Sequence, residues 1–182
     1  MEAMIETDRL LLRKPKLGDA KALNQADGDP EVMEFIGDGR TRTLEETRDA
    51  IKRWSAAWKA DGFGSLVIER KEDGKVLGRS GFLVWNSETW QTGTLQEYGD
   101  DIGVVELGWL LAKEHWGQGY ATEAAAAARD YAFIDLKLPR LISLIMKGND
   151  RSIKVAERIG ERYVRDVGRD DWSVRLYAVN RP

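Results

Sequence analysis

The sequence contains no cysteine and a single histidine, His115. The missing cysteines exclude disulfide bonds, thiolate nucleophiles and cysteine-bound metals, and one histidine cannot form a histidine-rich metal cluster. We therefore predict no metal site. A chain without cysteine is compatible with a reducing compartment, and we expect a cytoplasmic protein.

Long apolar runs and an excess of positive charge are also missing. No apolar run approaches the ~20 residues of a membrane-spanning helix, and residues 1–10 lack the basic-then-apolar pattern of a secretion signal. The formal net charge of −3 gives no basic surface for a nucleic acid. We expect neither a membrane nor a nucleic acid as a partner.

The chain nevertheless has enough apolar side chains for a substantial core. Its 182 residues are 42% hydrophobic and include seven tryptophans, which suits one globular domain. No repeat, low-complexity tract or linker divides the sequence, so residues 1–182 are predicted to form a single domain. Exposed tryptophans would be compatible with a homodimer, although no pattern specifies one.

The order of the sequence patterns predicts a mixed α/β fold of about seven strands. Strand patterns cover residues 9–15, a hairpin over 64–85, and residues 103–112, 140–146, 162–167 and 174–179. Helical patterns cover two short segments in 18–37, then residues 43–62, 119–136 and 150–160. Residues 86–102 are expected to be a polar loop. The sheet should be antiparallel first and parallel around residues 116–121.

Two glycines one residue apart lie between a predicted strand and a predicted helix, in Trp116-Gly117-Gln118-Gly119-Tyr120-Ala121. Such a junction lets backbone amides close on an anion, and the helix dipole adds positive charge there. A Walker loop is excluded because no Lys-Ser or Lys-Thr follows the glycines. A dinucleotide fingerprint is excluded because Thr122 occupies the third glycine position and residues 136–141 contain no acid. A plain strand-to-helix turn remains the alternative.

This loop resembles the coenzyme A pyrophosphate loop of the GNAT N-acetyltransferase superfamily, commonly Gln/Arg-x-x-Gly-x-Gly/Ala. The tryptophan at its first position departs from that pattern. It is similar to the Rim-type branch (ribosomal-protein N-terminal acetyltransferase-like), in which WGxGYATEA is usual. The segments TDRLLLRKP, ELGWLL and NDRSIKVAERIG match in the same order. One departure is that the branch usually continues Leu-Gly-Phe, where this chain reads Ile159-Gly160-Glu161.

The resemblance implies a fold and an activity. The fold is a single GNAT-like domain of the α/β (α+β) class, with a mixed, mostly antiparallel sheet, helices on both faces and a splayed central strand pair. The cofactor is acetyl-CoA. The activity is transfer of its acetyl group to a primary amine, on a small molecule or a protein N-terminus, by direct attack in a ternary complex. The alternative is an acyl-CoA-binding regulatory domain that transfers nothing.

Glu106 is the predicted catalytic base. In an extended strand Val104, Glu106 and Gly108 share one face, and a carboxylate among apolar neighbours costs free energy unless it is solvated or partnered. Gly108 leaves space beside it for a ligand. The resemblance also places a glutamate here, near the catalytic centre, where it would take a proton from the amine directly or through water. The alternative is a strand-end glutamate that is solvated or paired with an arginine.

The resemblance implies two further sets of cofactor residues. The main chain of Trp109, Leu110 and Leu111 would bind the pantetheine arm and the thioester carbonyl. Asn149 and Ser152 have the Asn-x-x-Ser spacing of the Rim-type branch, which implies a pantetheine contact for Asn149 and a catalytic position near the sulfur for Ser152. The alternative for both is an ordinary helix start. The pyrophosphate would lie on Trp116, Gly117, Gln118, Gly119, Tyr120, Ala121 and Thr122.

The amine acceptor leaves the weakest trace in the sequence. Aromatic faces and acidic groups both favour a cationic amine, which makes Trp85, Trp90, Tyr98 and Asp101 candidate substrate-binding residues. The alternative is that the aromatic residues pack in the core and the acids belong to a solvated loop. His115, just before the glycine loop, is expected at the surface and near a phosphate rather than as a base.

Overall fold

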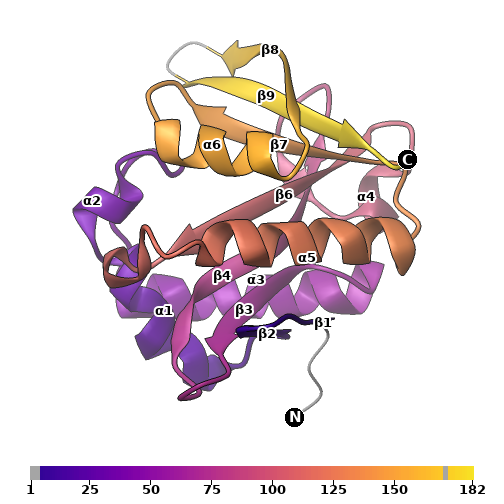
Figure 1. Cartoon of the computed structure of the whole chain (residues 1–182). Helices are drawn as coiled ribbons and strands as arrows, with labels where there is room; N and C mark the ends of the chain where they lie inside the picture. The colour runs from indigo at the N-terminus through magenta and orange to yellow at the C-terminus, as the bar shows by residue number, and fades with distance from the viewer. Residues whose placement is uncertain (1–4, 170–171) are drawn as a thin grey trace.

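The computed structural model describes residues 5–169 and 172–182 and contains one nine-stranded sheet in these ranges. The strand order is β1-β2-β3-β4-β6-β7-β9-β8, and β5 pairs with β4 beside this path (Figure 1). The strands are β1 Ile5–Glu6, β2 Leu10–Arg13, β3 Ser65–Arg70, β4 Val76–Asn86, β5 Thr92–Gly93, β6 Gly103–Leu111, β7 Arg140–Met146, β8 Arg162–Arg169 and β9 Trp172–Asn180.

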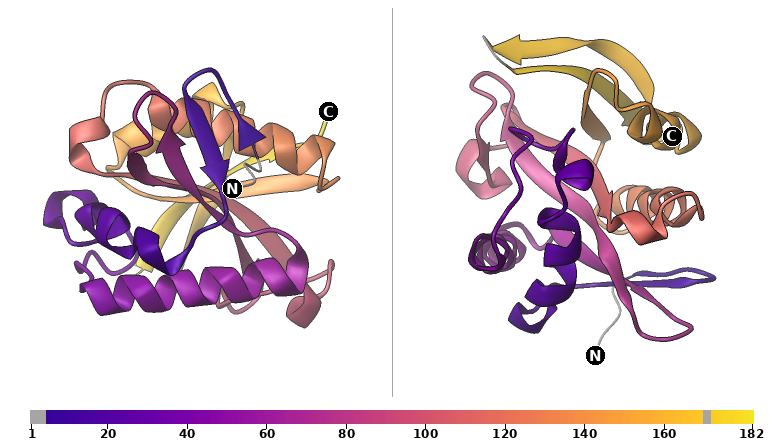
Figure 2. Two further views of the ribbon diagram at one scale, coloured as in Figure 1. Left: turned by 90° about the horizontal axis from the view of Figure 1, so that it is seen from below. Right: turned by 90° about the vertical axis from the view of Figure 1, so that its left-hand side faces the viewer.

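Helices cover both faces of this sheet, as predicted. α5 and α6 lie on one face, and α1 and α3 lie on the other (Figure 2). Within the described ranges, none of the helices is long and apolar enough to cross a membrane. The helices are α1 Ala20–Asp27, α2 Pro30–Met33, α3 Leu44–Asp61, α4 Leu95–Tyr98, α5 Tyr120–Ile134 and α6 Asp150–Arg158, with 3-10 turns at Leu17–Asp19 and Lys113–His115.

The long elements agree with the sequence patterns, and the short ones do not. α3 begins at the predicted capping box, in which Thr43 and Glu46 bond each other's backbone amides, and Gly62 ends it with φ 75°. The segment predicted to be a plain loop, 86–102, contains β5 and α4. The sheet therefore has two strands more than predicted, β1 and β5. Each has two residues, too few to show an alternating pattern.

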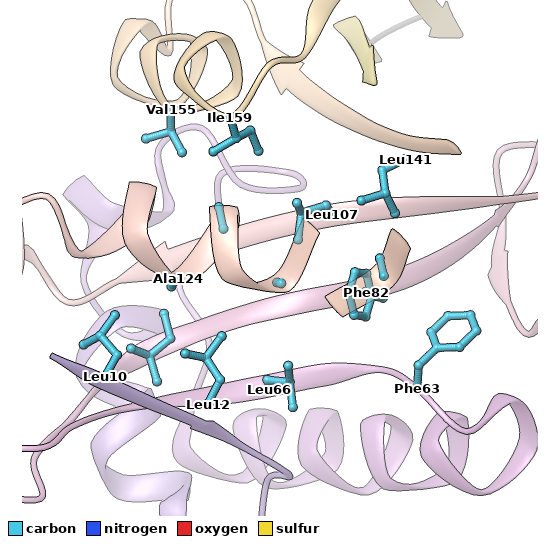
Figure 3. Packing of buried hydrophobic residues seen from close by; sticks show 14 of the residues in the cluster. Leu10, Leu12, Phe63, Leu66, Phe82, Leu107, Ala124, Leu141, Val155 and Ile159 are labelled. Carbon is cyan, nitrogen blue, oxygen red and sulfur yellow. The ribbon is translucent and has the colours of Figure 1, made fainter. Parts of the chain in front are cut away.

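The main core lies between the sheet and α5 (Figure 3). Val105, Leu107 and Leu111 of β6 belong to it, which agrees with the predicted alternation of that strand. Four alanines of α5 are fully buried, at positions 124, 125, 128 and 132. Their small side chains let the helix approach the sheet closely, so the alanine run serves packing.

β6 is held differently by its two neighbours. Its antiparallel pairing with β4 runs through nine residue pairs, from Gly78↔Leu111 to Asn86↔Gly103. Its parallel pairing with β7 consists of the single pair Glu106↔Ile142. The two strands therefore diverge beyond Glu106, and this gap is the splayed central strand pair.

Candidate active site

The gap between β6 and β7 opens into a cleft. Both strands, the start of α6 and the segment after α2 supply its walls. The lining residues are Phe35, Ile36, Glu106, Leu107, Gly108, Trp109, Ser143, Leu144, Ile145, Asn149 and Ser152. The cleft thus unites three of the predicted positions, Glu106, Asn149 and Ser152, which are far apart in the sequence.

Glu106 occupies the point where the strands separate. Its Oε2 accepts a hydrogen bond from Trp85 Nε1 at 2.6 Å, and its Oε1 accepts one from the Leu144 amide at 3.2 Å. Burial raises the pKa of Glu106 to about 7, although both hydrogen bonds favour the ionised form. Both partners are neutral donors, so the arginine-paired alternative does not describe this carboxyl. Its pKa suits a base that works near neutral pH.

The main-chain N–H and C=O groups of every second residue of β6 point into the gap. The Leu107 carbonyl faces β7, because Ser143 Oγ of β7 donates to it at 2.7 Å. The Gly108 carbonyl faces β4 and accepts from Ser80 Oγ at 2.9 Å. By this alternation the main-chain N–H of Trp109 points into the gap, whereas that of Leu110 belongs to the β4 ladder. Trp109 is therefore better placed than Leu110 to bind a ligand through its backbone.

Leu111 lies on the same edge of β6 as Trp109, but its carbonyl is already used. The Trp116 indole nitrogen donates to it at 3.0 Å. The guanidinium of Arg151, in the first turn of α6, lies 3.9 Å from the centre of the Trp116 ring. Trp116 therefore packs the glycine loop against β6 and α6. The sequence analysis missed Arg151, although it lies between Asn149 and Ser152 in the matched segment.

The glycine loop has the geometry of an anion site. Gly117 and Gly119 have φ values of 75° and 82°, a region that disfavours side chains with a Cβ. Gly119 is the N-cap of α5, and no side chain caps this helix. The first helical hydrogen bond runs from the Glu123 amide to the Gly119 carbonyl at 3.0 Å. The amides of residues 120–122 precede that bond, so the helix itself offers them no carbonyl partner.

Arg9 links this loop to the first turn of α5, and Glu123 balances its charge. Its Nη1 donates to the Gln118 carbonyl at 3.0 Å, and its Nη2 lies 2.6 Å from a carboxyl oxygen of Glu123. Its guanidinium also lies 4.4 Å from the centre of the Tyr120 ring. The N-terminal part of the chain therefore fixes the loop and the start of α5 together.

Asn149 and Ser152 serve the helix and the cleft at once. Asn149 is the N-cap of α6, and its Oδ1 accepts from the Ser152 amide at 3.2 Å. Both residues also line the cleft. The helix-start reading of these residues is therefore correct, and it places their remaining polar atoms beside the cleft.

The structure brings one of the four acceptor candidates to Glu106, namely Trp85. Trp90 packs against a separate apolar cluster of β7, β8 and β9, and the Tyr98 hydroxyl donates to the Thr92 carbonyl at 3.0 Å. Asp101 is exposed in a turn. These three residues do not line the cleft, and Trp85 reaches Glu106 without being one of the lining residues itself.

Phe35 and Ile36 reach the cleft instead. They were expected to belong to the second of two short helices in 18–37, whereas α2 ends at Met33 and leaves them in the segment that follows it. His115 also differs from expectation: it is buried, with 4% of its surface exposed, and burial lowers its pKa. His115 is therefore a buried, neutral imidazole and not the expected surface residue.

Comparison with known proteins gives a consistent result. The model of the acetyltransferase (GNAT) domain family matches residues 9–162. The N-acetyltransferase p20 of Bacillus licheniformis is 33% identical over 82% of this chain and 76% of its own length.

Two solved structures of acetyltransferases have a similar fold. An acetyltransferase from Agrobacterium tumefaciens is 33% identical, with a TM-score of 0.77 over 99% of this chain and 95% of its own. The ribosomal-protein acetyltransferase RimL in complex with coenzyme A has a TM-score of 0.78 over 98% of both chains at 16% identity, and so shares the fold. This chain belongs to the GNAT family of acetyltransferases.

Proposed function

We propose that this protein transfers the acetyl group of acetyl-CoA to a primary amine, with Glu106 as the base. The observation that carries the proposal is the position of Glu106. Its carboxyl lies at the opening of the β6–β7 gap, in the same cleft as Asn149 and Ser152. The pKa of about 7 lets it accept a proton at neutral pH.

The residues around the cleft fit acetyl-CoA, which supplies the activated acetyl thioester when bound. The amides of residues 120–122 and the dipole of α5 would hold the pyrophosphate, helped by Arg9 and Arg151. The pantetheine arm would lie along the open edge of β6, with Trp109 N–H directed at the thioester carbonyl and Asn149 beside the arm. RimL, which has the same fold, binds coenzyme A, and this supports the assignment.

Two proton tasks accompany the transfer. The acceptor is an ammonium with a pKa near ~10 in water, so it must lose a proton before its nitrogen can attack. Glu106 takes that proton directly or through water. The Ser152 hydroxyl, beside the cleft, would donate a hydrogen bond to the leaving sulfur, whose thiol has a pKa of about 8.5.

The acceptor would enter on the side of Phe35 and Ile36. These side chains offer apolar and aromatic contacts, and Glu106 is the carboxyl among the cleft residues that could attract an ammonium. Such a site suits a primary amine on a small molecule or at a protein N-terminus. RimL acetylates a ribosomal protein, which is one precedent within the fold.

An acetyl-CoA-dependent amine assay tests this function. The purified protein is incubated with acetyl-CoA and a panel of small amines and N-terminal peptides, and thiol release is followed. We expect release that depends on the amine and is reduced in Glu106→Gln. Acetyl-CoA binding without thiol release across the panel would favour the regulatory-domain alternative. That alternative assigns no role to the carboxyl of Glu106 or the hydroxyl of Ser152.

A further inference from the structure

Glu161 is a fully buried carboxyl on the core side of the same gap. It lies between the turn that ends α6 and the start of β8, and it stands where the Rim-type pattern has phenylalanine. Its Oε1 lies 2.9 Å from Ser143 Oγ, and its Oε2 has no hydrogen-bond partner among the described residues. A buried ionised carboxylate with an unpartnered oxygen would be costly.

The hydrogen bonds of Ser143 fix the protonation state of this carboxyl. Ser143 Oγ lies 2.7 Å from the Leu107 carbonyl and 2.9 Å from Glu161 Oε1. The hydroxyl has one hydrogen, and the carbonyl can only accept. Both contacts are hydrogen bonds only if Glu161 carries a proton and donates it to Ser143, which then donates to Leu107.

This chain of hydrogen bonds ends in the proposed active site. The Leu107 carbonyl belongs to the open edge of β6, between Glu106 and Trp109, where the β7 ladder is absent. Ser143 therefore replaces a ladder bond and fixes the spacing of the two strands. Loss of the proton on Glu161 would draw the Ser143 hydrogen to the carboxylate, because charge-assisted hydrogen bonds are the stronger ones. The Leu107 carbonyl would then lose its donor.

We propose that Glu161 is a positioning residue for acetyl transfer: its proton directs the Ser143 hydroxyl to Leu107, and its ionisation at alkaline pH releases that contact and slows the reaction. This inference rests on the proposed function, because it assigns Glu161 a role in the same cleft.

The surroundings of Glu161 explain when it ionises. Burial and the nearby charge of Glu106 raise the pKa of Glu161 to about 8, and the hydrogen bond that Ser143 would donate to the ionised carboxylate offsets part of this rise. Two nearby arginines are engaged elsewhere, since Arg129 and Arg162 donate to main-chain oxygens. Of the groups on the elements around it, Glu106 of β6 is the one whose charge acts on Glu161, and Tyr177 of β9 pairs with Ser143 in the sheet.

The kinetic test compares kcat from pH 6 to pH 9.5 in three proteins. In the wild type kcat should fall about three- to tenfold above pH 8, the effect of one lost hydrogen bond. Glu161→Gln keeps a donor for Ser143 and cannot ionise, so kcat near pH 7 should stay within a few-fold of the wild type and the alkaline fall should disappear. Glu157→Gln, an exposed position on α6, should keep the fall. An alkaline fall that persists in Glu161→Gln would overturn the inference.

Ser143→Ala provides a second variant, because it removes the hydroxyl that Glu161 would control. Its kcat should be lower at every pH and should show no alkaline fall. A Ser143→Ala protein with the same fall as the wild type would sink the inference even if Glu161→Gln does not fold.

An NMR titration separates this inference from the proposed function. In protein labelled with ¹³C at the glutamate carboxyls, the signal absent from Glu161→Gln should titrate with a midpoint near 8. A midpoint near the ordinary 4.5 would refute the protonated Glu161 whether or not any amine is acetylated. Conversely, the expected midpoint with no turnover on any amine would refute the transferase function alone.

Discussion

The two edges of β6 show how one strand can support both a fold and a site. The edge facing β4 is paired through nine residues, and the edge facing β7 is paired through one. On the open edge, side chains replace ladder bonds: the Glu106 carboxyl accepts from the Leu144 amide, and the Ser143 hydroxyl donates to the Leu107 carbonyl. The closed edge holds the strand in place, so the open edge can present its main chain to a ligand.

Two helix starts repeat this contrast. α3 begins with a capping box that satisfies its first amides within the protein. α5 begins after Gly119, which provides no side-chain cap and, like Gly117, is exposed. The capping box stabilises the start of α3, whereas the uncapped start of α5 can bind an anion.

The largest expected effect is that of Gly119→Glu, which places a side chain at the uncapped start of α5. The carboxylate would stand where the pyrophosphate is proposed to lie, and φ of 82° adds strain for any side chain with a Cβ. We expect acetyl-CoA affinity to fall on the order of 100-fold or more, measured by calorimetry. Gly62→Glu is the matched control, because Gly62 has φ 75° at the end of α3. Equal acetyl-CoA affinities in the two folded variants would contradict the loop assignment.

Glu106→Gln removes the base at the start of the open edge. We expect kcat to fall by ~10²–10⁴-fold with acetyl-CoA affinity nearly unchanged. In the wild type, kcat/KM should rise with pH up to about 7, because Glu106 acts only when ionised and its activity is lost as pH falls through that pKa. Glu97→Gln, exposed on α4, controls for the loss of a carboxylate. Wild-type turnover in Glu106→Gln across this pH range would remove Glu106 as the base.

Ser152→Ala tests the sulfur end of the cleft. Loss of one hydrogen bond to the leaving thiolate should lower kcat by about tenfold and leave acetyl-CoA affinity within a few-fold. Stopped-flow thiol release measures this, and Ser55→Ala, whose hydroxyl donates to the Ile51 carbonyl within α3, is the control. An unchanged kcat would leave Ser152 as a first-turn residue only.

The smallest effect should come from removing the N-terminal cap of α3. Thr43→Ala removes the capping box of α3 and should cost ~1 kcal/mol of unfolding free energy. In a domain of this size that lowers the Tm by roughly 2–4 °C. Acetyl-CoA affinity should be unchanged, because α3 lies on the face of the sheet away from α5 (Figure 2). A matching loss of affinity would mean that the two helix starts are coupled.

The sequence predicted what depends on local patterns. The alternation of β6, the turn before α5 and the ends of α3 follow from residue spacing, and the order of matched segments indicated the family. Contacts between distant segments left no such trace. Trp85 reaches Glu106 because β4 pairs with β6, and Glu161 reaches Ser143 through the turn after α6. The sequence showed that position 161 has glutamate where the Rim-type pattern has phenylalanine, but it did not show that Ser143 is the partner of this glutamate.

A thermal-unfolding titration with acetyl-CoA, with ATP and NAD as controls, tests most directly whether the glycine loop binds this cofactor. A ligand at 100 times its Kd adds about 2.7 kcal/mol to the unfolding free energy. At ~2–4 °C per kcal/mol, this raises the Tm of a domain of this size by roughly 5–10 °C. We expect that rise with acetyl-CoA and a much smaller one with ATP or NAD. No rise at millimolar acetyl-CoA would contradict this expectation and leave the glycine loop as a turn alone.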